Sequence, residues 1–231
     1  MAVILARITM KYLLSPYNYD LTDPGSIPNL FLQHLYLVGI AMIISLIIAI
    51  PLGILVARNR KLYPIVITIA DLLYTIPGIA LIGVLITVSL PGFGLGPLTA
   101  IIPLILYTQL VLIRNTAAGI NGIDPLMIEV GKAMGMSRWQ SFSRVTLPLA
   151  LPVIVAGIRI ATVTTVGIAS LASLVDQGGL GDLIFKNITN GDTDAVIAGA
   201  ILMSLFAILA DLLLLGIQTA LNRGRSALSV S

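Results

Sequence analysis

The chain has 231 residues, of which 58% are hydrophobic and only 10% are charged. A soluble domain usually carries about 25% charged residues, so this composition excludes an ordinary soluble protein. A membrane-spanning helix needs about 20 apolar residues, so the length accommodates five or six spans and no separate soluble catalytic domain. The absence of cysteine and the single histidine exclude disulfides and thiolate or histidine-based metal sites. The net charge of +3 is carried beside apolar stretches, which favours a membrane protein over a nucleic-acid-binding one.

Residues 1–29 begin with an apolar stretch and end in the turn-rich sequence SPYNYDLTDPGSIP. An apolar start is also typical of a signal peptide, but no small-residue cleavage site follows this one. We therefore expect an amphipathic helix on the outer membrane surface, followed by a link to the first span.

Five apolar stretches predict membrane-spanning helices, at residues 30–57, 62–90, 98–116, 147–175 and 195–221. His34 is expected at a helix end, at the membrane interface. The second stretch is broken at Ile76-Pro77-Gly78, and such a break is tolerated only where protein or a cavity covers the backbone. The sequence thus predicts an all-α membrane protein of about five transmembrane helices, with an outer-surface segment at 1–29, a transmembrane domain at 30–222 and a polar tail at 223–231.

The basic residues predict the orientation of these spans. Five spans place the turn at 58–61, the polar segment 117–146 and the C-terminus on one side of the membrane. Nine basic residues fall on that side and three on the other, which predicts a cytoplasmic C-terminus and an outer N-terminus. The nine are Arg58, Arg60, Lys61, Arg114, Lys132, Arg138, Arg144, Arg223 and Arg225; the three are Arg7, Lys11 and Lys186.

The polar segment carries the signals of two short helices. Asp124 is a good N-cap, and Pro125 suits the first helical turn, where its missing N–H costs nothing. Gly135 is placed to end that helix in a left-handed conformation. Ser137 and Gln140 have the spacing of a capping box, which begins a second helix.

Trp139 and Phe142 are three residues apart in that second helix, so both rings are expected on one face. Spacing alone leaves open whether the segment binds a partner or lies on lipid headgroups with its apolar face down, as many interfacial helices do.

The segment resembles the EAA loop of ABC importer permeases. That family's pattern is Glu-Ala-Ala, three residues, Gly, nine residues, Ile, one residue and Leu-Pro. Glu129, Gly135, Val145, Leu147 and Pro148 match it at the same spacing. Valine and glycine replace the two alanines, and valine replaces the isoleucine, which changes side-chain volume but leaves the spacing intact.

The resemblance implies that the loop is a coupling helix that docks into a groove on a cytoplasmic ATPase subunit. The residues it assigns to ATPase coupling are Glu129, Gly135, Ser137, Arg138 and Trp139. It also implies two ATPase subunits that bind ATP and Mg²⁺, a second permease subunit that is either a copy or a homologue, and an external substrate-binding protein. The chain itself is then expected to sit in the lipid of the cell membrane, to catalyse nothing and to bind no cofactor, metal or nucleic acid.

Further segments are similar to the osmoprotectant branch of these permeases, which imports glycine betaine, carnitine and choline. Methionine and other importer permeases share several of them, so a permease for another small solute remains the alternative. The segments lie at 74–77, 112–116, 135–137, 147–152, 157–159 and 178–182.

Asp71, Arg159 and Asp211 are charged residues inside predicted spans, where they are costly unless paired or hydrated. Counted from the predicted cytoplasmic ends at 1.5 Å per residue, all three lie about 15–18 Å deep, so pairing is possible. They fit an ion pair between helices, a water-lined pathway surface or the proton relay of a stand-alone secondary transporter. Against the last, the chain shows no inverted repeat.

Tyr74, Pro77, Gly178 and Gly179 are candidates for a translocation pathway or gate. The alternative for the first two is a packed proline kink, and for the glycines a simple turn. The GGLGD sequence at 178–182 lacks the Lys and Ser/Thr of a phosphate-binding P-loop, which predicts that ATP binds elsewhere.

Overall fold

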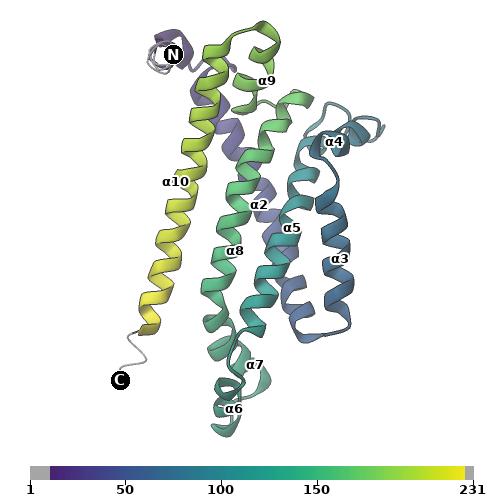
Figure 1. Cartoon of the computed structure of the whole chain (residues 1–231), viewed down its shortest axis with the longest axis vertical. Coiled ribbons are helices and arrows are strands. Elements are labelled where there is room, and N and C mark those ends of the chain that lie inside the picture. The colour runs from purple at the N-terminus through teal and green to yellow at the C-terminus, as the bar shows by residue number, and fades with distance from the viewer. Residues whose placement is uncertain (1–10, 227–231) are drawn as a thin grey trace.

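The structure, a computed structural model, describes residues 11–226, and every regular element among them is helical (Figure 1). The elements are η1 (Pro16–Tyr19), α2 (Ile27–Arg58), α3 (Leu62–Thr75), α4 (Gly78–Ile86), α5 (Pro97–Asn121), α6 (Pro125–Ala133), α7 (Arg138–Ser141), η2 (Phe142–Thr146), α8 (Leu147–Ile168), η3 (Ala169–Val175), α9 (Gly181–Asn190) and α10 (Thr193–Ser226).

The helices confirm an all-α membrane protein of about five spans. Within the described residues, four helices are long and apolar enough to cross a membrane, namely α2, α5, the continuous helix at 138–175, and α10. The fifth candidate span is the pair α3 and α4, which passes the same test together and is bent by 84° at the predicted break. The outer-surface helix expected within residues 1–29 lies largely outside the described residues.

The third span is longer than expected. It was expected to end at Thr116, but α5 continues to Asn121. Thr116, Ala117 and Gly119 are buried, and an added Cβ on Gly119 would lie 3.1 Å from the carbonyl oxygen of Ala150 in α8. Close packing of small residues against α8 therefore extends this helix beyond its apolar stretch.

The loop expected at 176–194 contains the helix α9, which ends at Gly191 in a left-handed conformation. His34 was expected at a helix end, but it is fully buried, with Nε2 3.0 Å from the carbonyl oxygen of Val166. The helix-end position was wrong because α2 begins at Ile27 and places His34 two turns inside the helix.

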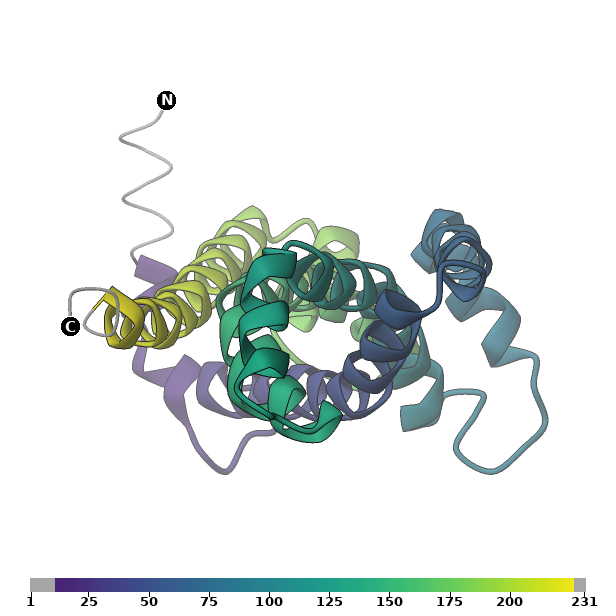
Figure 2. The same ribbon diagram turned by 90° about the horizontal axis from the view of Figure 1, so that it is seen from below.

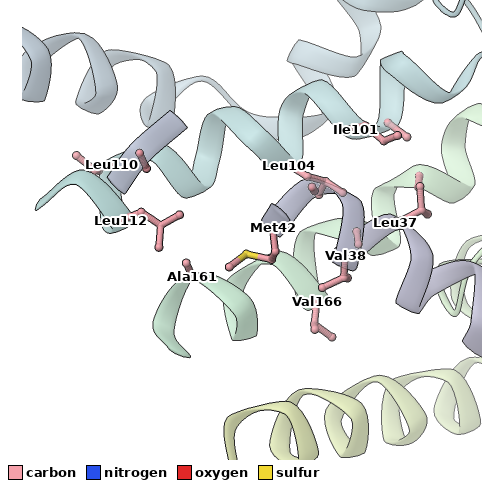
Figure 3. Packing of buried hydrophobic residues seen from close by; sticks show 14 of the residues in the cluster. Leu37, Val38, Met42, Ile101, Leu104, Leu110, Leu112, Ala161 and Val166 are labelled. Carbon is pink, nitrogen blue, oxygen red and sulfur yellow. The ribbon is translucent and has the colours of Figure 1, made fainter. Parts of the chain in front are cut away.

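Three long helices, α2, α5 and α8, form the core of the bundle. Leu37, Val38 and Met42 of α2 meet Leu104 of α5 and Val166 of α8 (Figure 3). Viewed from below, α10 lies on one flank of this core and α3 with α4 on the other (Figure 2).

The two ends of the bundle differ. The coupling segment (α6 and α7), the turn between α2 and α3 and the C-terminal end of α10 lie toward one end, whereas α4, α9 and the start of α2 lie at the other (Figure 1). This grouping agrees with the five-span order, and the basic residues predict that the first end is cytoplasmic.

Candidate functional site

Local hydrogen bonds fix the coupling segment. The carboxylate of Asp124 accepts a hydrogen bond of 2.9 Å from the N–H of Leu126, which caps α6 as expected. Gly135 has φ of +80°, which confirms the left-handed turn after α6. Ser137 and Gln140 form the predicted capping box. The backbone N–H of Gln140 donates to the Ser137 hydroxyl at 3.3 Å, and the backbone N–H of Ser137 donates to the side-chain oxygen of Gln140 at 2.8 Å.

The second short helix is the first turn of a long one. After α7 the chain makes a π-helical turn, η2, and continues without interruption into α8, so one helix runs from Arg138 to Val175. The wide turn lies just before Pro148, whose missing N–H interrupts the usual hydrogen-bond ladder. The second half of the coupling segment, α7, is therefore joined to a core helix without an intervening loop.

The five predicted coupling residues all lie at the surface of this end of the bundle. Glu129, Gly135, Ser137, Arg138 and Trp139 are exposed, and the indole of Trp139 is 73% exposed. Leu126, Met127 and Val130 of α6, and Met134 just after it, add exposed apolar area beside them. An exposed apolar cluster with charges at its edge is typical of a protein-binding surface.

The aromatic rings of Trp139 and Phe142 differ in their exposure. Trp139 and Phe142 are neighbours, with centroids 5.9 Å apart, but Phe142 is buried and Arg58 of α2 lies 4.4 Å above its ring. Phe142 therefore anchors the segment to the core, whereas Trp139 faces outward.

Sequence reasoning missed Gly131, which is buried where α6 meets α7. An added Cβ would lie 3.4 Å from Sδ of Met136 and 3.8 Å from Oγ of Ser141. Only a small residue fits there, which gives a physical reason for the alanine in the family pattern. Glu129 lies beyond the first turn of α6, so its carboxylate adds little to the helix dipole.

The intramembrane charges form two separate pairs. Arg159 of α8 donates to both carboxylate oxygens of Asp211 of α10, at 2.9 and 2.8 Å, and to Gln218 at 2.7 Å. Gln218 in turn donates to the carbonyl oxygen of Pro152 in α8 at 3.1 Å. These bonds clamp α10 against α8.

Asp71 does not join that clamp. Its partner is Arg114 of α5, whose Nη2 lies 3.1 and 3.0 Å from the two carboxylate oxygens. The sequence left open whether Arg159 pairs with Asp71 or with Asp211, and the structure pairs it with Asp211. Arg114 was expected at the cytoplasmic end of its span, but α5 continues seven residues past it.

Two tyrosines meet at the break between α3 and α4. Tyr74 and Tyr107 contact edge to face, with centroids 5.9 Å apart at 82°, and the Tyr107 hydroxyl donates to the carbonyl of Ile76. A cavity of about 310 Å³ opens here, lined by residues 74–78, Tyr107, Ile168 and Leu171.

The two glycines lie elsewhere, in the turn from η3 to α9. Gly178 and Gly179 have φ of +69° and +85°, and the N–H of Gly179 donates to the side-chain oxygen of Gln33 in α2 at 3.0 Å. The structure therefore does not bring the glycines to the tyrosine pocket.

Lys186 of α9 binds the same turn by bridging Asp182 at 2.6 Å and Asp176 at 3.2 Å. Its hydrogen bond to the carboxylate of Asp182 raises the pKa of Lys186. Lys186 is therefore charged at neutral pH, and the bridge weakens at high pH only as the pH rises above the usual lysine pKa of about 10.4.

Comparison with known proteins places these features in context. The family model described as "Binding-protein-dependent transport system inner membrane component" matches residues 49–226. Carnitine transport permease protein OpuCD of Listeria monocytogenes is 41% identical over 216 residues, covering 93% of each chain. Osmoprotectant import permease protein OsmW of Salmonella typhimurium is 40% identical over 206 residues, covering 89% of this chain and 96% of the relative. The glycine betaine/carnitine/choline transport system permease protein OpuCD of Bacillus subtilis is 40% identical over 92% of each chain.

The fold is also similar to a solved transporter. The inward-facing MetNI methionine ABC transporter contains a chain with a TM-score of 0.73 and 26% identity, covering 82% of this chain and 93% of that one.

Proposed function

Because the chain belongs to the family of binding-protein-dependent transport system inner membrane components, we propose that it imports small osmoprotectants such as glycine betaine, carnitine or choline. The identity of 40–41% over about nine-tenths of the chain to permeases named for these solutes carries the proposal. The methionine alternative rests on a likeness of only 26% identity, so we favour the osmoprotectant class.

The chain is the membrane-spanning permease of an ABC importer, and other subunits hydrolyse ATP and deliver the solute. We infer that two ATPase subunits, with ATP and Mg²⁺ bound to them, dock on the coupling segment, and that an external binding protein docks at the opposite end. The exposed side chains of α6 and α7 support the first inference, because they present apolar area and charge on one end of the bundle.

The architecture suggests how ATPase movement reaches the pathway. The coupling segment is continuous with α8, α8 packs closely on α5, and the clamp from Arg159 to Asp211 joins α8 to α10. A displacement of α7 therefore meets no intervening loop before it reaches the core.

Uptake by a reconstituted system tests the proposal. Proteoliposomes that hold this permease with its ATPase subunits and binding protein should accumulate radiolabelled glycine betaine, carnitine or choline when ATP is supplied on the ATPase side. Vanadate should stop the uptake, and methionine should not be accumulated. ATP-dependent uptake of methionine and of none of the three ammonium solutes would contradict the solute class.

A further inference from the structure

Polar and aromatic side chains line up along the contact between α3 and α5. At the break between α3 and α4, Tyr74 contacts Tyr107, and next to them along the same helix contact Asp71 pairs with Arg114. Further toward the coupling end, Tyr63 and Asn121 share a cavity of about 410 Å³. The α3–α5 seam, as we call this row of three pairs, therefore runs along one side of the bundle.

The spacing shows that each helix contributes a single face. On α5, the residues at 107, 114 and 121 are seven apart, which places them two turns apart on one side of the helix. On α3, Asp71 and Tyr74 are three apart and Tyr63 is eight before Asp71, which again gives one face.

The ion pair of the seam is poorly covered by the chain itself. The side chains of Asp71 and Arg114 are 47% and 49% exposed, although both helices lie within the membrane-spanning part. Charged side chains at such depth face a water-filled cavity or another protein surface rather than lipid.

The exposed surface of α10 provides the contrast. Most of its outward side chains are aliphatic, including Ile201, Leu205, Ile208 and Leu212. The carboxylate in the middle of its span, Asp211, is paired with Arg159 of α8. This is the pattern expected of a helix that faces lipid. The seam differs from it because each of its three pairs consists of polar or aromatic side chains.

We propose that the α3–α5 seam lines the water-filled path of the solute, and that the pocket between Tyr74 and Tyr107 is the subsite for its methylated ammonium group. This inference rests on the proposed function, because the solute class comes from there. Aromatic faces attract quaternary ammonium ions, and a cavity of about 310 Å³ suits a small solute.

The neighbouring groups add charges of both signs beside the pocket. Asp71 lies one turn of α3 from Tyr74, so the ion pair lies next to the pocket. Its carboxylate attracts the ammonium group of a solute, and its guanidinium attracts a solute carboxylate. The bond from the Tyr107 hydroxyl to Ile76 fixes the backbone at the break, so the pocket is preformed.

The absence of cysteine from the chain allows a direct test with single-cysteine variants. Thr75→Cys places a thiol in the pocket, and Ile208→Cys places a control thiol on the aliphatic face of α10. The probe is a thiosulfonate reagent that carries a trimethylammonium group, applied to the permease–ATPase complex in liposomes. We expect Thr75→Cys to react about tenfold faster or more, because only a hydrated thiol ionises readily.

Protection by solute tests the subsite. Whichever of glycine betaine, carnitine or choline the wild-type complex transports should slow the modification of Thr75→Cys and leave Ile208→Cys unaffected. Adding Tyr74→Leu should raise the half-protecting concentration about five- to thirtyfold, the range expected for a lost cation–π contact, whereas Tyr74→Phe should keep it near the parent value.

The outcomes separate this inference from the proposed function. Slow modification of Thr75→Cys, with normal uptake by the wild type, refutes the proposal that the seam lines a water-filled path. The importer assignment would still stand. Fast modification without protection, or equal protection in the Tyr74→Leu background, overturns the subsite. Failure of the wild type to transport any of the three solutes refutes the solute class and with it the ammonium subsite.

Discussion

Gly135 offers the sharpest test of the coupling segment. Its φ of +80° lies in the left-handed region, and an added Cβ would meet no atom within 4 Å. Replacement by valine therefore causes no clash, and its whole cost is conformational. For a residue other than glycine that cost is about 1–2 kcal/mol, which disfavours the native turn about five- to thirtyfold.

We expect Gly135→Val to leave the spans inserted but to release the ATPase or to uncouple ATP hydrolysis from uptake, because the turn sets the angle at which α6 and Trp139 are presented. Gly135→Asn should retain most of the coupling, since asparagine tolerates the left-handed region. The measurement is co-purification of the ATPase with the permease, together with solute uptake in vesicles.

Gly191 is a matched control, because its φ is +73°, it too has no atom within 4 Å of an added Cβ, and it lies at the opposite end of the bundle. Gly191→Val should carry a similar backbone cost and still retain the ATPase. Normal retention and normal uptake in Gly135→Val would refute the coupling role and reduce the segment to an interfacial loop.

Three further predictions follow from the described contacts. Single cysteines at Asn59 and Ala133 should be labelled only from the cytoplasmic side and one at Thr189 only from outside; labelling of Ala133→Cys from outside would contradict the orientation. Arg159→Met should lower the melting temperature and yield of the complex because it leaves Asp211 uncompensated, and the double change Arg159→Met with Asp211→Leu should recover part of both; a fully stable single variant with reduced uptake would instead favour a pathway role. Gly131→Ala should be tolerated, because its Cβ would lie 3.4 Å from Met136, whereas Gly131→Val should weaken ATPase retention by pushing α6 away from α7; equal retention in both would show that this contact does not position α6.

The parts of the site that the sequence predicted are those fixed by neighbours in the chain. The caps at Asp124 and Ser137 and the turn at Gly135 depend on hydrogen bonds and dihedral angles within a few residues, so spacing alone was enough to predict them. The break between α3 and α4 was predicted for the same reason, because Pro77 acts locally.

The partners of the charges could not be predicted in this way. Asp71 and Arg114 are 43 residues apart, and Arg159 and Asp211 are 52 apart, so each pairing depends on how whole helices pack. The length of α5 was missed for a related reason, since contacts with α8 and not local composition decide it. The position of His34 was missed because α2 begins at Ile27, earlier than the apolar stretch indicated. The helix α9 had a usable signal in Gly191, which closes it in the left-handed conformation.

The position of Asp211 in the last helix bears on how the protein is made. Translation and membrane insertion proceed from the N-terminus, so α8 enters the membrane with Arg159 before Asp211 has been synthesised. During that interval the guanidinium lies in an apolar span without the carboxylate that it binds in the finished chain. The core of α2, α5 and α8 can close beforehand, because few residues of the apolar stretch of α10 are buried (6%). Formation of the ion pair therefore waits until residue 211 has been synthesised and inserted, and a chain that stops short of residue 211 retains an uncompensated guanidinium in α8.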